Sequence, residues 1–363
     1  MNRPRRSLAA AFVAALALHP PSVAHASWAS DGNLLVGGVN SPVSPTVVAG
    51  AENSVFLAWL DGRSGVDSDL RASRWTAGGV AASGWTGDGD LVAEEVCLKS
   101  GLCAAPDGLG GALYAWSDLR CLSYRQVYVS HALPAGAPAG SWGTEGIPVA
   151  TTTADQSAPA IAGDGAGGAF VAWQDLRGAD ADLYLQHVDG TGAVVAGWPA
   201  TGLGIAVVPG AQSAPVIVGD GAGGVFVAWQ DRRAANDDVY LQHVTGGGAL
   251  AAGWAANGIA VCNAPGDQRG ISMVGDDASG VFIAWQDHRA LDWDLYALRV
   301  LGNAVRAPGW VANGVAVTQA GDDQLAVRAA RDGAHGVLLA WQDHRGADWD
   351  VYALRLAADA SVA

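Results

Sequence analysis

The hydrophobic and polar positions of this chain repeat with a period of about 56 residues. Each unit contains four short strand-like segments, which in the fourth unit are residues 214–218, 225–229, 239–244 and 249–254. The second segment is continuously apolar, which is typical of a strand buried on both faces. The turn before it reads Asp-Gly-Ala-Gly-Gly at 220–224, and Asp-Gly and Gly favour the positive φ of a hairpin turn. The pattern therefore predicts an all-β chain of repeated four-stranded sheets.

A shared motif, Ala-Trp-x-Asp-x-Arg, marks six units. Its Trp residues are Trp59, Trp116, Trp173, Trp229, Trp285 and Trp341. A second Trp follows 25 or 26 residues later in the first five units, and Trp28 supplies the sixth copy. The residues after Trp341, continued from Ser27 to Trp59, make up about one more period. An open solenoid would need polar capping repeats, so the spacing predicts a six-bladed β-propeller over residues 27–363, its last blade closed by the two termini.

The N-terminus has the features of a secretory signal peptide. Arg3, Arg5 and Arg6 precede an apolar stretch over 8–18, and Ala24-His25-Ala26 provides small residues for cleavage. The apolar stretch is too short to cross a bilayer, which needs roughly 20 residues. We therefore predict a signal peptide over residues 1–26 and a secreted or periplasmic product, cut near Ala26, with no membrane span.

Composition narrows the choice of partners. The chain is 50% hydrophobic and only 15% charged, which excludes intrinsic disorder. Its formal net charge of −15 argues against nucleic acid and anionic membrane surfaces as partners. We expect a monomer that meets an extracellular or surface ligand, either a carbohydrate or a protein.

The repeat resembles that of known proteins. Trp-Gln-Asp-x-Arg followed by Asp-[Leu/Val]-Tyr is similar to repeats of bacterial secreted β-propeller proteins, and more loosely to the TolB-type propeller repeat. The resemblance covers residues 27–363. It implies the fold and export much more than an activity, because propellers host enzymes, binders and scaffolds alike.

Several repeated residues are best explained by structure. The repeat Trp residues occur in every unit, so we interpret them as core between blades. The Asp-x-Arg residues and the later Asp, as in Asp175, Arg177 and Asp182, are expected to form a charged fork between strands two and three. The alternative is a ring of calcium sites at the Asp-x-Asp pairs, and no other cofactor is expected.

The chain has four Cys residues, and export favours their oxidation. We predict a Cys97–Cys121 disulfide, with Cys103–Cys121 as the alternative pairing. Cys262 lies far along the chain and is expected to be free and buried.

Departures from the repeat suggest where a ligand binds. Blades five and six place His288 with Trp293, and His344 with Trp349, on loops of the face that also carries Asp155, Asp267 and Asp323. Arg328 enters an inner ring where the other five blades have small or mostly apolar residues. Aromatic, imidazole and guanidinium groups together suit a carbohydrate or a carboxylate. The candidate ligand-binding residues are His288, Trp293, Arg328, His344, Trp349, Gln268 and Gln324. Recent duplication of one blade, with solvated loop residues, is the alternative.

No known catalytic motif is present in the chain, and its four Glu all precede the third blade. The main prediction is therefore a non-catalytic binding module that recognises its ligand through the loop face, and is not an enzyme. A carbohydrate-active enzyme, glycosidase- or lyase-like, with its site at the channel mouth is the first alternative. A structural surface scaffold is the second.

Overall fold

The computed structural model describes residues 32, 34–36, 42–63, 65, 68–94, 97–120, 123–136 and 139–363. The predicted signal peptide and Trp28 lie outside the described residues. In the part of the chain that is described, no helix has the length and hydropathy needed to cross a membrane. The described residues are almost entirely strands and turns, with one short 3-10 helix, η1 (Gly140–Trp142).

The strands form six antiparallel sheets of consecutive strands. Sheet one contains β1 (Val43–Ala49), β2 (Ser54–Asp61), β3 (Asp69–Thr76) and β4 (Asp90–Ala93). Sheet two contains β5 (Lys99–Pro106), β6 (Ala112–Asp118), β7 (Gln126–Ala132) and β8 (Ile147–Pro148). Sheet three contains β9 (Gln156–Gly163), β10 (Ala169–Asp175), β11 (Asp182–Val188) and β12 (Leu203–Ala206).

The second half of the chain repeats this order. Sheet four contains β13 (Gln212–Gly219), β14 (Val225–Asp231), β15 (Asp238–Val244) and β16 (Ile259–Cys262). Sheet five contains β17 (Gln268–Gly275), β18 (Val281–Asp287), β19 (Asp294–Val300) and β20 (Val315–Thr318). Sheet six contains β21 (Gln324–Arg331), β22 (Val337–Asp343) and β23 (Asp350–Leu356), and so has three strands within the described residues.

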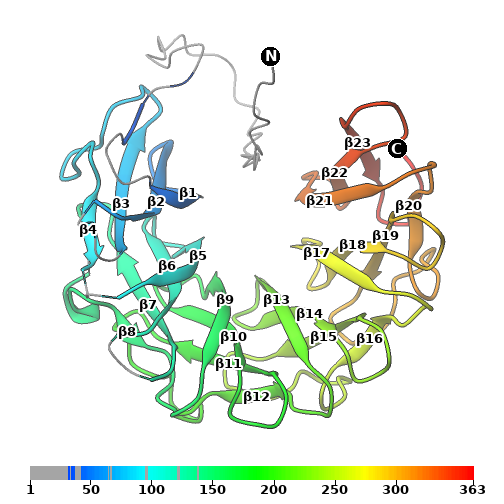
Figure 1. Cartoon of the computed structure of the whole chain (residues 1–363), viewed down its shortest axis with the longest axis horizontal. Helices are drawn as coiled ribbons and strands as arrows, with labels where there is room; N and C mark the ends of the chain where they lie inside the picture. The colour runs from blue at the N-terminus through cyan, green and yellow to red at the C-terminus, as the bar shows by residue number, and fades with distance from the viewer. Residues whose placement is uncertain are drawn as a thin grey trace.

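The six sheets follow one another around a central space, with the first strand of each sheet nearest the centre (Figure 1). First strands of successive sheets contact one another from β1 to β21. This confirms an all-β architecture of six sheets, five of them four-stranded. Sheets one and six stand on either side of an opening in the ring (Figure 1), and the predicted closure by the termini involves residues that are not described.

One predicted strand of the fourth unit was misplaced. In the fourth unit the prediction put the last strand at 249–254, but β16 lies at Ile259–Cys262. The predicted segment is a turn that contains Trp254, and its pairing with β15 is limited to an isolated bridge between Val244 and Leu250 and a bond from the N–H of Ala251 to the carbonyl of His243. Gly253 in that turn has φ 89°, a left-handed conformation that ends an extended run.

The core lies between the sheets. The second strands are buried as predicted, and β14 exposes only Gln230 partially. Each hydrophobic cluster joins residues of neighbouring sheets, as where Phe170 and Ala172 of sheet three pack with Val225 and Val227 of sheet four. Each sheet therefore depends on its neighbours for burial of its apolar faces.

Among the described residues, one face of sheet six has no such neighbour. Val351 occupies the position of Leu183, Val239 and Leu295 in the three preceding sheets. Those three side chains are fully buried, whereas Val351 is 65% exposed. The uncovered face lies at the opening of the ring.

Candidate functional site

The Asp-x-Arg motif places its arginine against its aspartate in every sheet. In sheet three, Arg177 donates from Nε to Oδ1 of Asp175 at 2.8 Å and from Nη2 to Oδ2 at 2.6 Å. Trp173 Nε1 also donates to Asp175 Oδ2 at 2.9 Å, and the guanidinium lies 3.7 Å from the ring centre of Tyr184. Burial opposes ionisation of Asp175, but the bonds from Arg177 and Trp173 outweigh it and lower the pKa of that carboxyl. The predicted fork is confirmed for Asp175 and Arg177.

The later Asp plays a different part from the one predicted. Asp182 lies opposite Asp175 across the hairpin, and burial raises its pKa. In sheet four the same effects, burial first and then the charge of Asp231, raise the pKa of Asp238 to about 6. These second carboxyls are held near other carboxylates rather than by the arginine. Within the described residues no group of three or more His, Cys, Asp or Glu side chains could hold a metal ion.

All six repeat Trp residues are buried in the ring of sheets, and none of them lines its central space as an exposed side chain. The most exposed of them have only 5% of their surface accessible. Each indole donates to the Asp two residues further on, and the six residues are Trp59, Trp116, Trp173, Trp229, Trp285 and Trp341.

The loops between second and third strands and the starts of the first strands lie at the same end of the ring. We call this end the loop end. In the predicted site there, the rings of His288 and Trp293 lie 4.8 Å apart, and those of His344 and Trp349 lie 4.8 Å apart. Trp293 also carries the guanidinium of Arg269, 3.9 Å from its ring centre. Trp349 is 49% exposed, so its ring is more accessible to a ligand than the ring of Trp293.

The arginine predicted for the inner ring is in the expected register. Arg328 lies opposite Ala340, and the five corresponding residues are Thr46, Cys103, Ala160, Val216 and Ser272. Arg328 is exposed and donates to the carbonyl of Val327. It therefore faces solvent on the innermost strand of sheet six.

Two predicted ligand-binding residues are not at the surface. Gln268 and Gln324 are fully buried. Their Nε2 atoms donate to carbonyls of the loops that lead into β17 and β21, at 2.9 Å to Gly266 and 2.7 Å to Asp322. These amides hold the loops in place, and a ligand on the loop end would not reach them.

The acidic residues beside these glutamines join successive sheets. Asp267 Oδ1 accepts the N–H of Asp237 at 3.1 Å, and Asp323 Oδ1 accepts the N–H of Trp293 at 3.1 Å. Asp155 makes the same bond to the N–H of Arg125. Asp323, Trp293 and Arg269 are therefore linked by direct contacts at the junction of sheets five and six. The sequence signal for them was the acidic residue before each inner strand.

Of the four cysteines, Cys97, Cys103 and Cys262 are among the described residues. Cys121 lies outside the described residues, so the Cys97–Cys121 pairing stays a prediction. Cys262 is fully buried and, within the described residues, forms no disulfide. Burial raises the pKa of its thiol to about 12, so it is a poor nucleophile.

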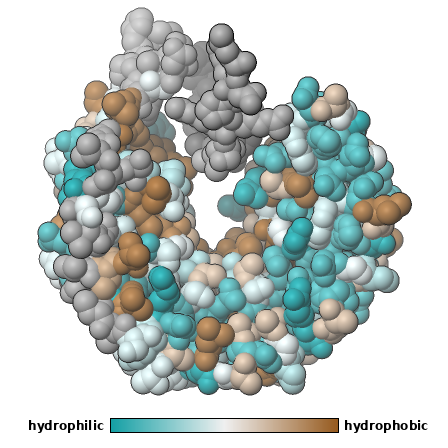
Figure 2. All heavy atoms as spheres, viewed as in Figure 1, coloured by the Kyte–Doolittle hydropathy of each residue, from teal (hydrophilic) through white to brown (hydrophobic). Residues whose placement is uncertain are grey.

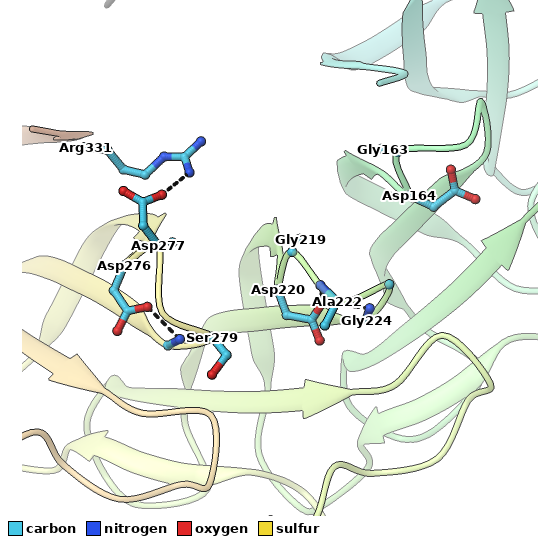
Figure 3. Close-up of a pocket in the computed structure, with 15 residues that line it drawn as sticks. Gly163, Asp164, Gly219, Asp220, Ala222, Gly224, Asp276, Asp277, Ser279 and Arg331 are labelled. Atoms are coloured by element: carbon cyan, nitrogen blue, oxygen red, sulfur yellow. Dashed lines mark hydrogen bonds and ion pairs between the residues drawn. The ribbon is translucent and has the colours of Figure 1, made fainter. Parts of the chain in front are cut away.

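A cavity of about 550 Å³ lies at the opposite end of the ring, which we call the hairpin end. It is lined by the hairpins that join first and second strands in sheets three, four and five, and by Arg331 at the end of β21 (Figure 3). Sequence reasoning missed this cavity. Its signal was the replacement of repeat glycines by Asp277 and Arg331.

Comparisons with known proteins bear on the fold. The chain matches no family model and no curated protein. Among solved structures, the Hadza microbial sialidase Hz136 superposes with a TM-score of 0.50 at 10% identity, over 85% of this chain and 64% of the sialidase. A Dyadobacter fermentans protein of unknown function gives 0.47 at 14% identity, over 86% and 93% of the two chains. An α-L-arabinanase from Penicillium chrysogenum gives 0.42 at 11% identity, over 87% and 93%.

These comparisons correct two predictions. The non-catalytic binding module was the main prediction, with the protein not an enzyme. The sialidase, which superposes at a TM-score of 0.50, is instead a carbohydrate-active enzyme. It agrees better with the alternative prediction, an enzyme acting on carbohydrate. At these identities the likeness shows the fold, and it does not bear on the resemblance to TolB-type repeats.

Proposed function

We propose that the protein is an exported carbohydrate-active enzyme, glycosidase- or lyase-like, whose site lies at the loop end beside sheets five and six. The observation that carries this proposal is the contact chain of Arg269, Trp293 and Asp323, with Asp267 at the start of the neighbouring inner strand. The fold shared with a sialidase supports it. Hydrophilic residues also predominate on the side of the ring formed by the later sheets (Figure 2).

The chemistry follows from the residue types. Glycoside hydrolysis usually needs two carboxyl groups, one to protonate the leaving oxygen and one to act as base or nucleophile. Asp267 and Asp323 lie at the starts of adjacent inner strands. In each carboxylate, Oδ1 accepts a bond from a backbone N–H. Arg269 and Arg328 supply exposed guanidinium groups that bind hydroxyl or carboxylate oxygens. The exposed ring of Trp349 is suited to stacking on a sugar.

The test is turnover of glycans by the mature chain from Ser27. Reducing ends report hydrolysis, and ultraviolet absorbance of unsaturated products reports elimination. We expect Asp267→Asn and Asp323→Asn each to lower kcat/KM by at least about 100-fold, as loss of a general acid or base does. Asp155→Asn is the matched control, because Asp155 makes the same backbone bond in sheet three, and it should retain activity.

A wild-type protein inactive on neutral, uronic and sialylated glycans would overturn the proposal. Full activity in both Asn variants would place the chemistry elsewhere. Thermal unfolding of each variant separates loss of catalysis from loss of fold.

The proposal includes a closed six-bladed ring. At five junctions the second Trp donates from Nε1 to a turn carbonyl of the next sheet, at Pro134, Gly190, Gly246, Gly302 and Ala358. Arg299 donates to the same Ala358 carbonyl that Trp310 uses. The repeat spacing assigns the sixth junction to Trp28 and Arg355 on the carbonyl of Ala77. Such closure would cover the exposed face of Val351 and make the protein a monomer.

A further inference from the structure

The cavity at the hairpin end has the size and shape of a ligand site. Its volume of about 550 Å³ falls within the range of small-molecule sites. Its walls are mainly glycine backbone, with the side chains of Asp277, Ser279 and Arg331 at the rim (Figure 3). It lies at the ends of β9, β13 and β17, whereas Asp267 and Asp323 lie where the inner strands start. The cavity is therefore separate from the proposed catalytic site.

Two residues of the rim depart from the repeat and meet each other. Asp277 stands where sheets three, four and six have Gly165, Gly221 and Gly333. Arg331 stands where sheets three to five have Gly163, Gly219 and Gly275. Arg331 reaches from sheet six to sheet five, and its Nη1 donates to Asp277 Oδ1 at 2.5 Å.

The fold does not require this pair. Neighbouring sheets form the same hairpin with glycine at both positions. Asp277 has φ 61°, a left-handed conformation that is unfavourable for a residue other than glycine. The pair is 60% exposed at Arg331 and 33% exposed at Asp277, where an ion pair stabilises little. Stability therefore does not explain the two replacements.

The other carboxylates of the cavity already have partners. Asp276 accepts from Arg299 at 3.0 Å, Asp220 contacts His243 at 2.8 Å and Asp164 contacts His187 at 3.2 Å. Each also accepts two backbone N–H groups of its own hairpin, so these three side chains shape the wall. The rim pair cancels its own charge and offers both donors and acceptors. No aromatic side chain lines the cavity.

We propose that this cavity binds a neutral, hydroxyl-rich ligand, namely one or two sugar units of a glycan. Asp277 and Arg331 would accept and donate hydrogen bonds to neighbouring hydroxyls, and Ser279 would add a third polar contact. Binding would be by hydrogen bonds rather than stacking. The ligand class rests on the proposed function, since the same glycan would reach both ends of the ring.

The experiment measures binding of cellobiose, maltose and arabinobiose by saturation-transfer NMR and calorimetry, with glucuronic acid and glucosamine as charged probes. Asp277→Gly and Arg331→Gly restore the glycine of the other sheets, so both variants should fold. We expect each to weaken binding of the neutral sugar at least tenfold. Gly275→Arg should also abolish binding, because a Cβ there meets nothing closer than 4.0 Å and a long side chain fills the cavity.

The outcomes are distinct from those of the turnover assay. Asp267→Asn with Asp323→Asn should remove turnover and leave this binding unchanged. The glycine variants should leave turnover of a short substrate unchanged. Absence of binding by the wild type, binding of only a charged sugar, or unchanged binding in both glycine variants would each overturn the proposal.

Discussion

Sheets three and four share one set of core residues with sheets five and six, and differ from them at both ends of the ring. All four sheets share the buried Trp, the Asp–Arg fork and the stacked Tyr. At the loop end, sheets three and four have Ala181 and Asp237 where sheets five and six have Trp293 and Trp349. At the hairpin end, His187 and His243 give way to Arg299 and Arg355. The repeat thus separates the invariant positions of the buried Trp, the fork and the Tyr from positions where the residue type varies between sheets.

The largest expected effect tests the shared part of the comparison. Trp229→Ala and Trp285→Ala each remove a fully buried indole, so each should lower the free energy of unfolding by about 3–5 kcal/mol. Trp349→Ala, at a half-exposed position, should cost less than about 1 kcal/mol. Urea denaturation measures all three. Equal losses at Trp285 and Trp349 would abolish the distinction between core and rim.

Loss of the Asp–Arg fork should lower the free energy of unfolding by nearly as much as loss of a buried Trp. The effect should be equal in sheet four and in sheet five. Asp231→Ala and Asp287→Ala leave a mostly buried arginine without its bidentate partner and the Trp indole without its acceptor. We expect each to lower the free energy of unfolding by about 3 kcal/mol. A difference between the two beyond about 1 kcal/mol would show that the sheets are not equivalent at this position.

The smallest effect concerns the second carboxyl, which sheet two replaces with Gln126. The folded pKa of Asp238, about 6, lies above the ordinary value of 3.8. Its protonated form is therefore favoured by folding, and the stability it contributes is complete below about pH 4 and lost as the pH rises through 6.

Asp238→Gln removes this loss of stability at high pH. Relative to wild type, the free energy of unfolding of the variant should therefore be about 1 kcal/mol higher at pH 8 than at pH 4.

Asp343 should show the opposite dependence of stability on pH. Its pKa is lowered to about 2, mainly by the bond from Arg345, so its contribution is present above about pH 4 and lost as the pH falls toward 2. Thermal unfolding across this range checks both, and a pH-independent effect of Asp238→Gln would contradict the first.

The sequence predicted the parts of the molecule that periodicity controls. The six sheets, the buried Trp residues and the register of Arg328 all follow from spacing. It misplaced the fourth strand of the fourth unit because Trp254, the second Trp of that unit, lies in a turn rather than in a strand. It placed Gln268 on the surface because a polar residue at a strand start gives no sign that its amide closes a buried loop.

The candidate site was only partly predictable. His288, Trp293, His344 and Trp349 were found because they break the repeat. Asp277 and Arg331 break it as clearly, but they lie 54 residues apart in sequence, and only the fold brings them to one cavity. The repeat period of a sequence does not indicate which residues of different units contact one another.

The turn carbonyls that join the sheets have an evolutionary consequence. Four of them, at Pro134, Gly246, Gly302 and Ala358, contact both an indole and an arginine or histidine side chain of the preceding sheet. Arginine and histidine both occupy that second position, and glycine, alanine and proline all supply the carbonyl. Because the acceptor is backbone, a duplicated unit brings a complete joint with it. Duplication or deletion of a unit can therefore change the length of this array without a new interface, while the rim residues of each copy diverge independently.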